Sequence, residues 1–135
     1  MTTVTFQTLK PADTEPEVLY EVADHVATIT LNAPGRMNTI SGRMLDELTD
    51  LLLRADRARD VRCIVLTGAG KVFCAGLDMA AQMQSEKGSL GNMGGTGEEG
   101  IPGELDLRAT PPTVLHNLDT PTICALNGGA AGYGL

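Results

Sequence analysis

Two short glycine-bearing segments hold the backbone groups that could do chemistry in this chain. They are residues 73–78 (FCAGLD) and residues 127–134 (NGGAAGYG). Each follows an apolar strand pattern, 62–67 before the first and 122–126 before the second, so each lies where a strand gives way to a loop or a helix. Backbone N–H groups that point outward at such places suit a developing oxyanion. The two segments therefore predict a site that stabilises negative charge on an oxygen atom.

Other glycine motifs in the chain do not complete a known phosphate or nucleophile signature. Residues 68–71 (GAGK) are similar to part of a Walker A loop, but Val65 stands where the first glycine should be and Val72 replaces the Ser or Thr. Residues 128–134 do not make a dinucleotide fingerprint, because Ala131 occupies a required glycine position. No Gly-x-Ser-x-Gly element is present, so a serine hydrolase has no visible nucleophile.

Length, composition and charge indicate a single soluble domain. The 135 residues are 42% hydrophobic and 20% charged, and a chain of this size can bury roughly two thirds of the surface that its unfolded form exposes. With a net charge of −7 and only 10 Lys and Arg, the chain lacks the footprint of a nucleic-acid-binding protein. It has no run of about 18 apolar residues and no leader pattern at its start. We expect a cytoplasmic protein with neither a membrane nor a nucleic-acid partner.

The cysteines and histidines predict neither a metal site nor a disulfide framework. Cys63, Cys74 and Cys124 are an odd number, at spacings that fit no known framework. Cys63 and Cys124 lie in apolar strand patterns and are expected to be inert buried thiols. Cys74 is expected to serve packing, unless adjacent amides lower its pKa and make it reactive. For His25 and His116 we expect surface or capping roles, because no nucleophile pattern lies near either.

The first half of the chain predicts the strands and the helix that would position these segments. Residues 18–22 and 26–31 predict a hairpin. Ser41 is the expected N-cap of a helix over 41–59. The apolar residues of this helix recur at helical spacing: Leu45, Leu48, Leu52 and Ala55. Residues 63–66 have the composition of a strand buried on both faces, which with the preceding helix predicts a β-α-β crossover.

The remaining segments are less regular. Residues 1–16 predict a flexible N-terminal arm. Residues 87–103 hold seven glycines and predict a mobile loop, which is either a lid or insertion beside a site or a segment without function. Residues 111–112 are both proline, so a helix is expected to begin after them and to end before Pro121. Residues 122–126 predict a further buried strand.

Taken in order, these motifs resemble the crotonase (enoyl-CoA hydratase/isomerase) superfamily, from about Val18 to the end of the chain. The matching blocks are residues 26–34 (VATITLNAP) with Arg36 and Asn38, residues 64–68 (IVLTG) with residues 73–78, and residues 121–128 (PTICALNG). The resemblance implies an α/β fold, the crotonase-like (ClpP/crotonase) spiral of β-β-α units. Residues 17–135 would be the N-terminal part of such a domain, incomplete at its C-terminus.

The resemblance also implies a site that binds acyl-CoA thioesters and stabilises an enolate or oxyanion at the thioester carbonyl. Carried over by position, the two donors are the backbone N–H groups of Leu77 and Tyr133, the latter where the family usually has glycine. The residues expected to contact coenzyme A are Arg36, Ala75, Gly76, Leu77, Asp78 and Met79. Arg36 would contact the phosphates, or else be a surface arginine, and Asp78 would cap a helix or transfer a proton. Coenzyme A would be part of the substrate, with no permanently bound cofactor and no metal.

Among the reactions of the family, the resemblance favours enoyl-CoA hydration first and isomerisation second. Both are reactions of fatty acid metabolism. Hydration needs a general acid and a general base, commonly two carboxylates, and the family positions of both fall beyond Leu135. We therefore expect this chain alone to be inactive. The alternative of another class is a non-catalytic truncated fragment or assembly piece. The expected partners are an acyl-CoA or enoyl-CoA substrate, further copies in a homotrimer or hexamer, and a complementary C-terminal segment.

Overall fold

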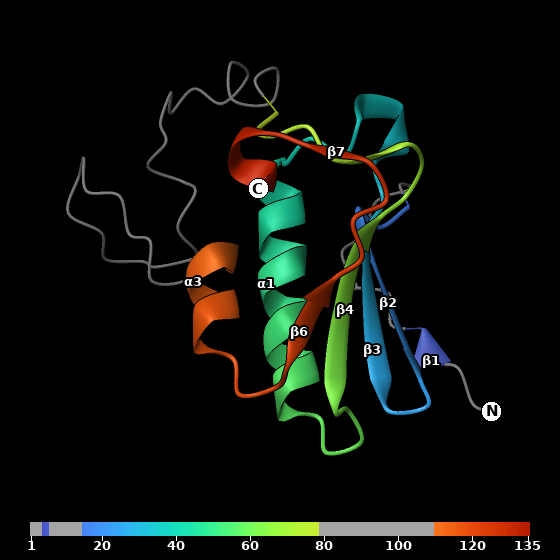
Figure 1. Ribbon diagram of the computed structural model, residues 1–135, viewed down its shortest axis with the longest axis vertical. Coiled ribbons are helices and arrows are strands. Elements are labelled where there is room, and N and C mark those ends of the chain that lie inside the picture. Colours follow the sequence, from blue (N-terminus) through green and yellow to red (C-terminus); the bar gives the residue numbers. More distant parts are fainter. Residues whose placement is uncertain (1–3, 6–14, 79–109) are drawn as a thin grey trace.

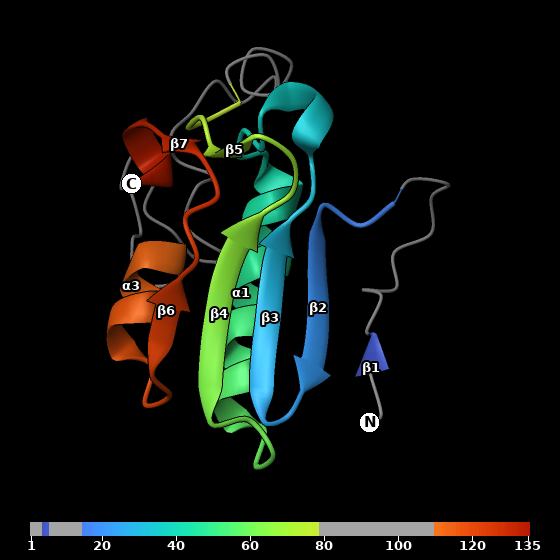
Figure 2. The same cartoon turned by 45° about the vertical axis from the view of Figure 1, so that its right-hand side comes forward.

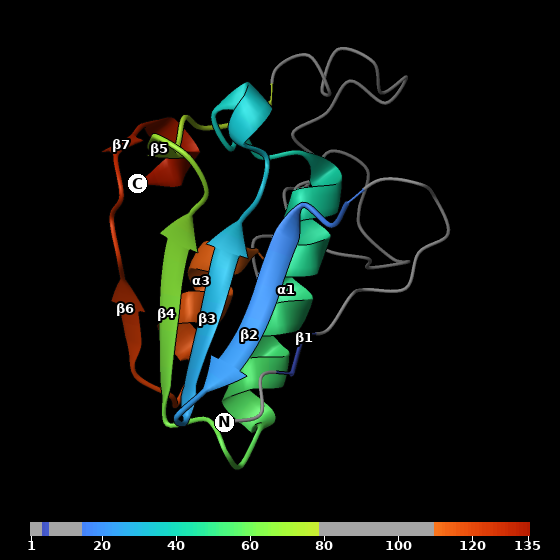
Figure 3. The ribbon, with the colours of Figure 1, turned by 90° about the vertical axis from the view of Figure 1, so that its right-hand side faces the viewer.

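The computed structural model of the chain describes residues 4–5, 15–78 and 110–135. The described residues form a larger sheet of strand order β1-β2-β3-β4-β6 and a small sheet of β5 and β7. The strands are β1 (Val4–Thr5), β2 (Val18–Ala23), β3 (Val26–Leu31), β4 (Cys63–Gly68), β5 (Val72–Cys74), β6 (Thr122–Cys124) and β7 (Gly129–Ala130). The helices are α1 (Gly42–Arg57) and α3 (Pro111–Asn117), with 3₁₀ turns η1 (Pro34–Arg36) and η3 (Gly132–Gly134). Both α-helices cover the same face of the larger sheet (Figures 1 and 3).

The predicted hairpin is present, and its pattern of burial follows its alternating sequence. Strands β2 and β3 pair antiparallel from Val18 opposite Leu31 to Ala23 opposite Val26. Ala27, Ile29 and Leu31 on β3 are at most 2% exposed, because successive side chains of a strand point to opposite faces and this face lies against the helices. At the turn, His25 is exposed and its Nδ1 lies 2.8 Å from the carbonyl oxygen of Asp60. The expected surface or capping role of His25 fits this position.

Two predicted segments lie wholly or largely outside the described residues. The glycine-rich segment 87–103 is one of them, so its prediction as a mobile loop is not tested. Most of the expected arm over residues 1–16 is the other. Within it, β1 pairs antiparallel with β2, placing Val4 opposite Val22.

Helix α1 begins and ends close to the predicted bounds. Ser41 is its N-cap, and its hydroxyl accepts a hydrogen bond from the N–H of Met44 at 3.1 Å, which satisfies one of the donors left free at a helix start. The predicted apolar face is buried in the structure: Leu45, Leu48, Leu52 and Ala55 are at most 6% exposed. Near the other end of the helix, Asp56 accepts hydrogen bonds from the N–H groups of Asp119 and Thr120. This contact joins α1 to the segment that leads into β6.

Strands β4 and β6 extend the sheet in parallel with β3, which confirms the β-α-β unit around α1. The prediction that β4 is buried on both faces is wrong. Ile64 and Leu66 are at most 8% exposed, whereas Cys63 and Val65 are only half-buried, because α1 and α3 cover one face of the sheet. The strand predicted over 122–126 is present as β6, but the prediction that it is buried is wrong.

Strand β6 ends at Cys124 and is exposed along its length. It is the last strand in the order and pairs with β4 alone among the described strands, so its outer edge stays open. Ile123 is 56% exposed for this reason. Cys124 is exposed and Cys63 half-buried, so neither is the fully buried thiol that the sequence predicts.

Helix α3 begins earlier than predicted. It starts at Pro111 and includes both prolines in its first turn, after Thr110 as N-cap. The first turn of a helix leaves its N–H groups without partners in the helix, so a residue that lacks an N–H costs nothing there. His116 lies exposed near the end of this helix, in agreement with the expected surface role.

The chain after α1 repeats one arrangement that the sequence does not reveal. A strand of the large sheet leads directly into a short strand of the small sheet twice, as β4 and β5 and then as β6 and β7. The strands of the two repeats pair in parallel, β4 with β6 and β5 with β7. The small sheet lies beyond the carboxyl ends of β3, β4 and β6, near the start of α1 (Figure 2). In open sheets with parallel strands, ligands bind at this end.

Candidate functional site

The two glycine-bearing segments lie side by side, although about fifty residues separate them in the chain. Strands β5 and β7 pair in parallel, with Val72 opposite Gly129 and Cys74 opposite Ala130. The N–H of Ala131 donates to the carbonyl of Cys74 at 3.0 Å. The pairing therefore brings the turns that follow both strands to one place.

Glycines allow the two turns to approach this closely. A Cβ atom at Gly76 would lie 3.2 Å from the carbonyl oxygen of Ala131 and 4.0 Å from the backbone nitrogen of Tyr133. A Cβ atom at Gly134 would lie 2.9 Å from the Cys74 sulfur. Gly76 is also at φ +113°, a conformation that residues with side chains rarely adopt. The nitrogen of Tyr133 thus lies directly beside the turn that carries Leu77.

The peptide that joins Gly76 to Leu77 has a fixed orientation. The carbonyl of Gly76 accepts a hydrogen bond from the N–H of Ile40 at 2.8 Å, and the N–H of Asp78 donates to the carbonyl of Ile40 at 2.9 Å. In a trans peptide the N–H points opposite to the C=O, so the N–H of Leu77 is directed away from Ile40. Within the described residues it has no acceptor, which makes it available to a ligand.

The N–H of Tyr133 also has no acceptor among the described residues, for a different reason. Tyr133 lies in the first turn of η3, where the hydrogen bonds begin only with Gly134 N–H to Ala131 C=O at 2.9 Å. The start of a helical turn leaves its first N–H groups unpaired. The two predicted donors are therefore neighbouring backbone groups, each without an acceptor among the described residues.

The side chain of Tyr133 packs inward. Its ring lies against the hydrophobic core, and its hydroxyl is buried without a hydrogen bond of normal geometry in the described part of the chain. Burial raises the pKa of this phenol, and the nearby side chain of Thr110 lowers it by a smaller amount. The ring thus holds η3 against the hydrophobic core.

Five of the six residues expected to contact coenzyme A lie together: Arg36, Ala75, Gly76, Leu77 and Asp78. The sixth, Met79, is outside the described residues. The N–H of Ala75 donates to the carbonyl of Met37 at 3.1 Å, so this stretch runs along the loop after β3. The Arg36 guanidinium lies between two carboxylates, 3.1 Å from Glu17 and 3.6 Å from Asp78. Asp78 is thus an ion-pair partner of Arg36, and its expected role as a helix cap concerns residues outside the described part of the chain.

Two asparagines hold the loop between β4 and β5, which sets the start of the first glycine segment. Asn38 is fully buried; its Oδ1 accepts from the N–H of Ala33, and its Nδ2 donates to the carbonyls of Ala69, Val72 and Phe73. Asn127 accepts from the N–H of Gly68 and donates to the carbonyls of Gly70 and Val72.

Sequence reasoning used Asn38 only as part of the family resemblance, and Asn127 also as the first residue of the second glycine segment. It missed the contacts that Glu17 and Glu47 make. A signal existed for Glu47, because this charged residue lies on the apolar face of α1 and is 8% exposed.

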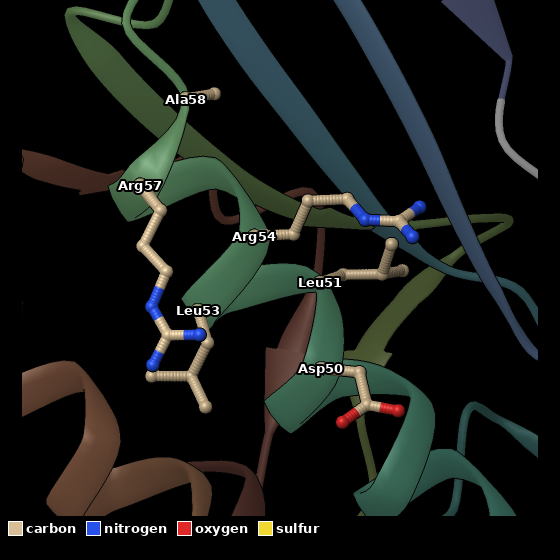
Figure 4. A pocket seen from close by; sticks show the side chains of 6 residues that line it. All are labelled: Asp50, Leu51, Leu53, Arg54, Arg57 and Ala58. Carbon is tan, nitrogen blue, oxygen red and sulfur yellow. The ribbon is translucent and has the colours of Figure 1, made fainter.

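Other features of the structure do not add to this site. Burial raises the pKa of the Cys74 thiol, so the adjacent amides do not activate it, and it serves packing. Among the described residues no group of His, Cys, Asp and Glu is arranged to hold a metal ion. A cavity of about 540 Å³ lies along the second half of α1, away from the glycine segments (Figure 4). In the described parts of the chain, no helix has the length and the apolar character needed to cross a membrane.

Comparison with known proteins agrees with this geometry. The sequence profile of the enoyl-CoA hydratase/isomerase family matches residues 21–135. The chain belongs to the enoyl-CoA hydratase/isomerase family. Among its relatives is a probable enoyl-CoA hydratase, EchA14, of Mycobacterium tuberculosis, 41% identical over 118 residues. The 1,2-epoxyphenylacetyl-CoA isomerase of Escherichia coli K12 is 37% identical over 119 residues. Each match covers 87% of this chain and 42% of the relative.

Solved structures of the family show the same fold. An enoyl-CoA hydratase from Mycobacterium marinum superposes with a TM-score of 0.69 at 29% identity, over 87% of this chain and 51% of that protein. An enoyl-CoA hydratase/isomerase from Xanthobacter autotrophicus gives 0.66 at 32% identity, over 85% and 40%. The chain thus has the crotonase fold predicted from its sequence, of which it covers a part. It spans about two fifths of the length of the curated relatives named here.

Proposed function

We propose that this chain carries the thioester-binding and oxyanion-stabilising part of an acyl-CoA enzyme. The backbone N–H groups of Leu77 and Tyr133 are its two donors. One observation carries the proposal: the Gly76–Leu77 peptide is held by Ile40 with its N–H directed away, beside the free N–H of Tyr133. Two donors aimed at one thioester oxygen stabilise the negative charge that develops on it, and losing one such donor typically costs about 3 kcal/mol.

The substrate is proposed to be an enoyl-CoA, with hydration as the first reaction and isomerisation as the second. The M. tuberculosis relative is named a probable enoyl-CoA hydratase and the E. coli relative an isomerase of an acyl-CoA, which supports the thioester class and leaves both reactions open. Coenzyme A enters with the substrate. The main chain over 75–78, followed by Met79, is the proposed path of its pantetheine arm.

The acid–base groups of the reaction are proposed to lie outside this part of the fold. Asp78 is next to the Leu77 donor, but it pairs with Arg36. Asp78 is therefore a poor candidate for proton transfer, and the chain explains binding and charge stabilisation better than the proton transfers.

Calorimetry and absorbance test the proposal together. Crotonyl-CoA should bind to the protein by isothermal titration calorimetry, and free coenzyme A more weakly, because it has no thioester carbonyl. Hydration removes the conjugated double bond of crotonyl-CoA and lowers its near-ultraviolet absorbance. Isomerisation of a 3-enoyl-CoA creates such a bond and raises the absorbance. Binding without either change would identify the chain as a binding piece, and a lack of any binding would refute the proposal.

An assembly through the face around β6 is also proposed. Ile123 and Leu126 are 56% and 62% exposed, and exposed apolar side chains that lie together commonly mark an interface. Further copies, in a trimer or a pair of trimers, and a complementary C-terminal segment are the two candidates. Sedimentation analysis together with the intact mass of the purified protein distinguishes them.

A further inference from the structure

The guanidinium of Arg36 is already engaged on two sides. Its Nη1 donates to Glu17 Oε1 at 3.2 Å and its Nη2 lies 3.1 Å from Glu17 Oε2, so the two side chains form a bidentate pair. Its Nε donates to the carbonyl of Thr39 at 3.1 Å and lies 3.6 Å from Asp78 Oδ2. The planar fork of arginine suits the bidentate contact with Glu17, whereas Nε donates to Thr39 and forms with Asp78 an ion pair longer than a hydrogen bond.

Glu17 is in turn held in place by α1. The N–H groups of Glu17 and Val18 both donate to Glu47 Oε2 at 3.0 Å, and the hydroxyl of Ser41 donates to Glu17 Oε2. Glu47 itself pairs with Arg43 at 2.8 Å. The Glu17 carboxylate is thus a fixed anchor, which sets the position of the Arg36 side chain.

Asp78 connects this anchor to the proposed oxyanion donor. Its backbone N–H donates to Ile40, and its carboxylate, 19% exposed, faces Arg36. Since Asp78 follows Leu77 directly, a contact on its side chain and one on its backbone both restrain the turn that presents the Leu77 N–H.

The charge around Arg36 disfavours a phosphate. At neutral pH the three carboxylates of Glu17, Glu47 and Asp78 face the two guanidinium groups of Arg36 and Arg43, a formal sum of about −1. A phosphate of coenzyme A would meet this net negative charge and would compete with Asp78 for Arg36.

We propose that Arg36 is a positioning residue, which Glu17 holds against Asp78 so that the Leu77 N–H keeps its direction toward the thioester oxygen. This role differs from the contact to coenzyme A phosphates that the family resemblance implied. It rests on the proposed function only for its effect on thioester binding. The restraint on the turn is a property of the chain itself.

Two substrates separate a positioning role from a phosphate contact. Crotonyl-pantetheine carries the same thioester as crotonyl-CoA but none of its nucleotide phosphates. Glu17→Gln removes the charge of the anchor and should weaken the binding of both thioesters by a similar factor in calorimetry, because both lose the oriented Leu77 donor. If Arg36 instead binds phosphate, Glu17→Gln should change the affinity for crotonyl-CoA alone, and this outcome overturns the proposal.

Amide hydrogen exchange tests the same proposal without turnover. In Glu17→Gln the amides of Asp78 and Ile40, which make the hydrogen bonds that hold the turn, should exchange faster than in the unmodified protein, while exchange along α1 stays the same. Glu21→Gln is the matched control, because Glu21 is an exposed residue four positions from Glu17 in the chain; it should change neither exchange nor binding. Unchanged exchange at Asp78 and Ile40 in Glu17→Gln refutes the positioning role even if the protein proves to bind no thioester.

A second variant covers the case in which Glu17→Gln does not fold. Arg36→Lys keeps the positive charge but reaches one carboxylate only, since an ammonium lacks the planar fork. It should raise the exchange rates of the Asp78 and Ile40 amides and weaken the binding of both thioesters. A change confined to the affinity for crotonyl-CoA would contradict the proposal in this variant too.

Discussion

Asn38 and Asn127 donate hydrogen bonds to the same carbonyl oxygen, that of Val72, at 2.9 and 3.3 Å. One asparagine follows β3 and the other follows β6, so the start of β5 is held from both sides. Because β5 leads into the turn with Leu77 and β7 into the turn with Tyr133, these two side chains set the distance between the proposed donors. The site therefore depends on two side-chain amide groups that take no part in the chemistry.

Replacing Asn38 should cost far more stability than replacing Asn127. Asn38→Ala leaves the buried carbonyls of Ala69 and Phe73 without their donor, and each buried polar group without a partner costs about 1–3 kcal/mol. Asn127→Ala should cost about 1 kcal/mol, because Asn127 is exposed and water can replace its contacts. Urea unfolding measures both free energies.

The backbone of Asn38 calls for one control in this comparison. Its φ is +52°, which asparagine and glycine tolerate better than alanine. Asn38→Gly removes the side-chain hydrogen bonds without that strain, so it should remain clearly less stable than Asn127→Ala. Equal losses in these two variants would show that the buried hydrogen bonds of Asn38 contribute little.

Two adjacent glycines offer a test of the close packing between the glycine segments. A Cβ at Gly128 would overlap the carbonyl oxygen of Lys71 and lie 3.1 Å from the Cα of Val72, whereas a Cβ at Gly129 meets nothing within 4 Å. Gly128→Ala should therefore cost about 1–3 kcal/mol and push the two strands apart. Gly129→Ala should stay within about 0.5 kcal/mol of the unmodified protein. Thermal unfolding and thioester binding measure both effects, and similar losses in the two variants would contradict this packing.

Tyr133→Phe should preserve stability at neutral pH and improve it at high pH. The hydroxyl is buried without a normal hydrogen bond, so its removal leaves no partner unsatisfied. Burial raises the pKa of Tyr133 in the folded state, so its contribution to stability is complete below the unfolded value of about 10 and is lost as the pH rises through the folded pKa.

Denaturant unfolding at about pH 8 and about pH 11 measures this difference. The unmodified protein should lose more stability between the two conditions than Tyr133→Phe does. Tyr20, whose pKa burial also raises, should account for part of the loss that remains in the variant. An identical loss in both proteins would show that the Tyr133 phenol ionises as freely in the folded state as in the unfolded chain.

The three cysteines should differ in their rates of reaction with a thiol reagent such as dithionitrobenzoate. Cys124 is exposed and should react first, Cys63 is half-buried and should follow, and Cys74 should react only when the protein unfolds. Burial keeps the thiolate fraction of Cys74 low by raising its pKa. In Cys124→Ser the fast phase should disappear, and a fast phase that persists would place reactivity at Cys63 or Cys74 instead.

The elements that depend on local pattern could be predicted from the sequence. The hairpin of β2 and β3 and the helix α1 follow from the spacing of apolar residues and from Ser41 as N-cap, because periodicity decides which face of an element is buried. The burial of β6 could not be predicted in this way. An apolar run shows that a strand can be buried, but only the position of the strand in the sheet decides whether anything covers it.

The candidate site, too, could be predicted from the sequence in part, and the rest was decided by the tertiary structure. The glycines, their order along the chain and the family that they resemble are all properties of the sequence, and the resemblance predicts Leu77 and Tyr133 as the donors. The direction of these N–H groups was decided by tertiary structure: Ile40 turns the Gly76–Leu77 peptide, and Cys74 aligns the second turn through Ala131. The partners of Arg36 also come from distant parts of the chain, Glu17 and Asp78. Hydrogen bonds and ion pairs between segments far apart in the chain form only when the fold brings their atoms together, and no local pattern of residues records them.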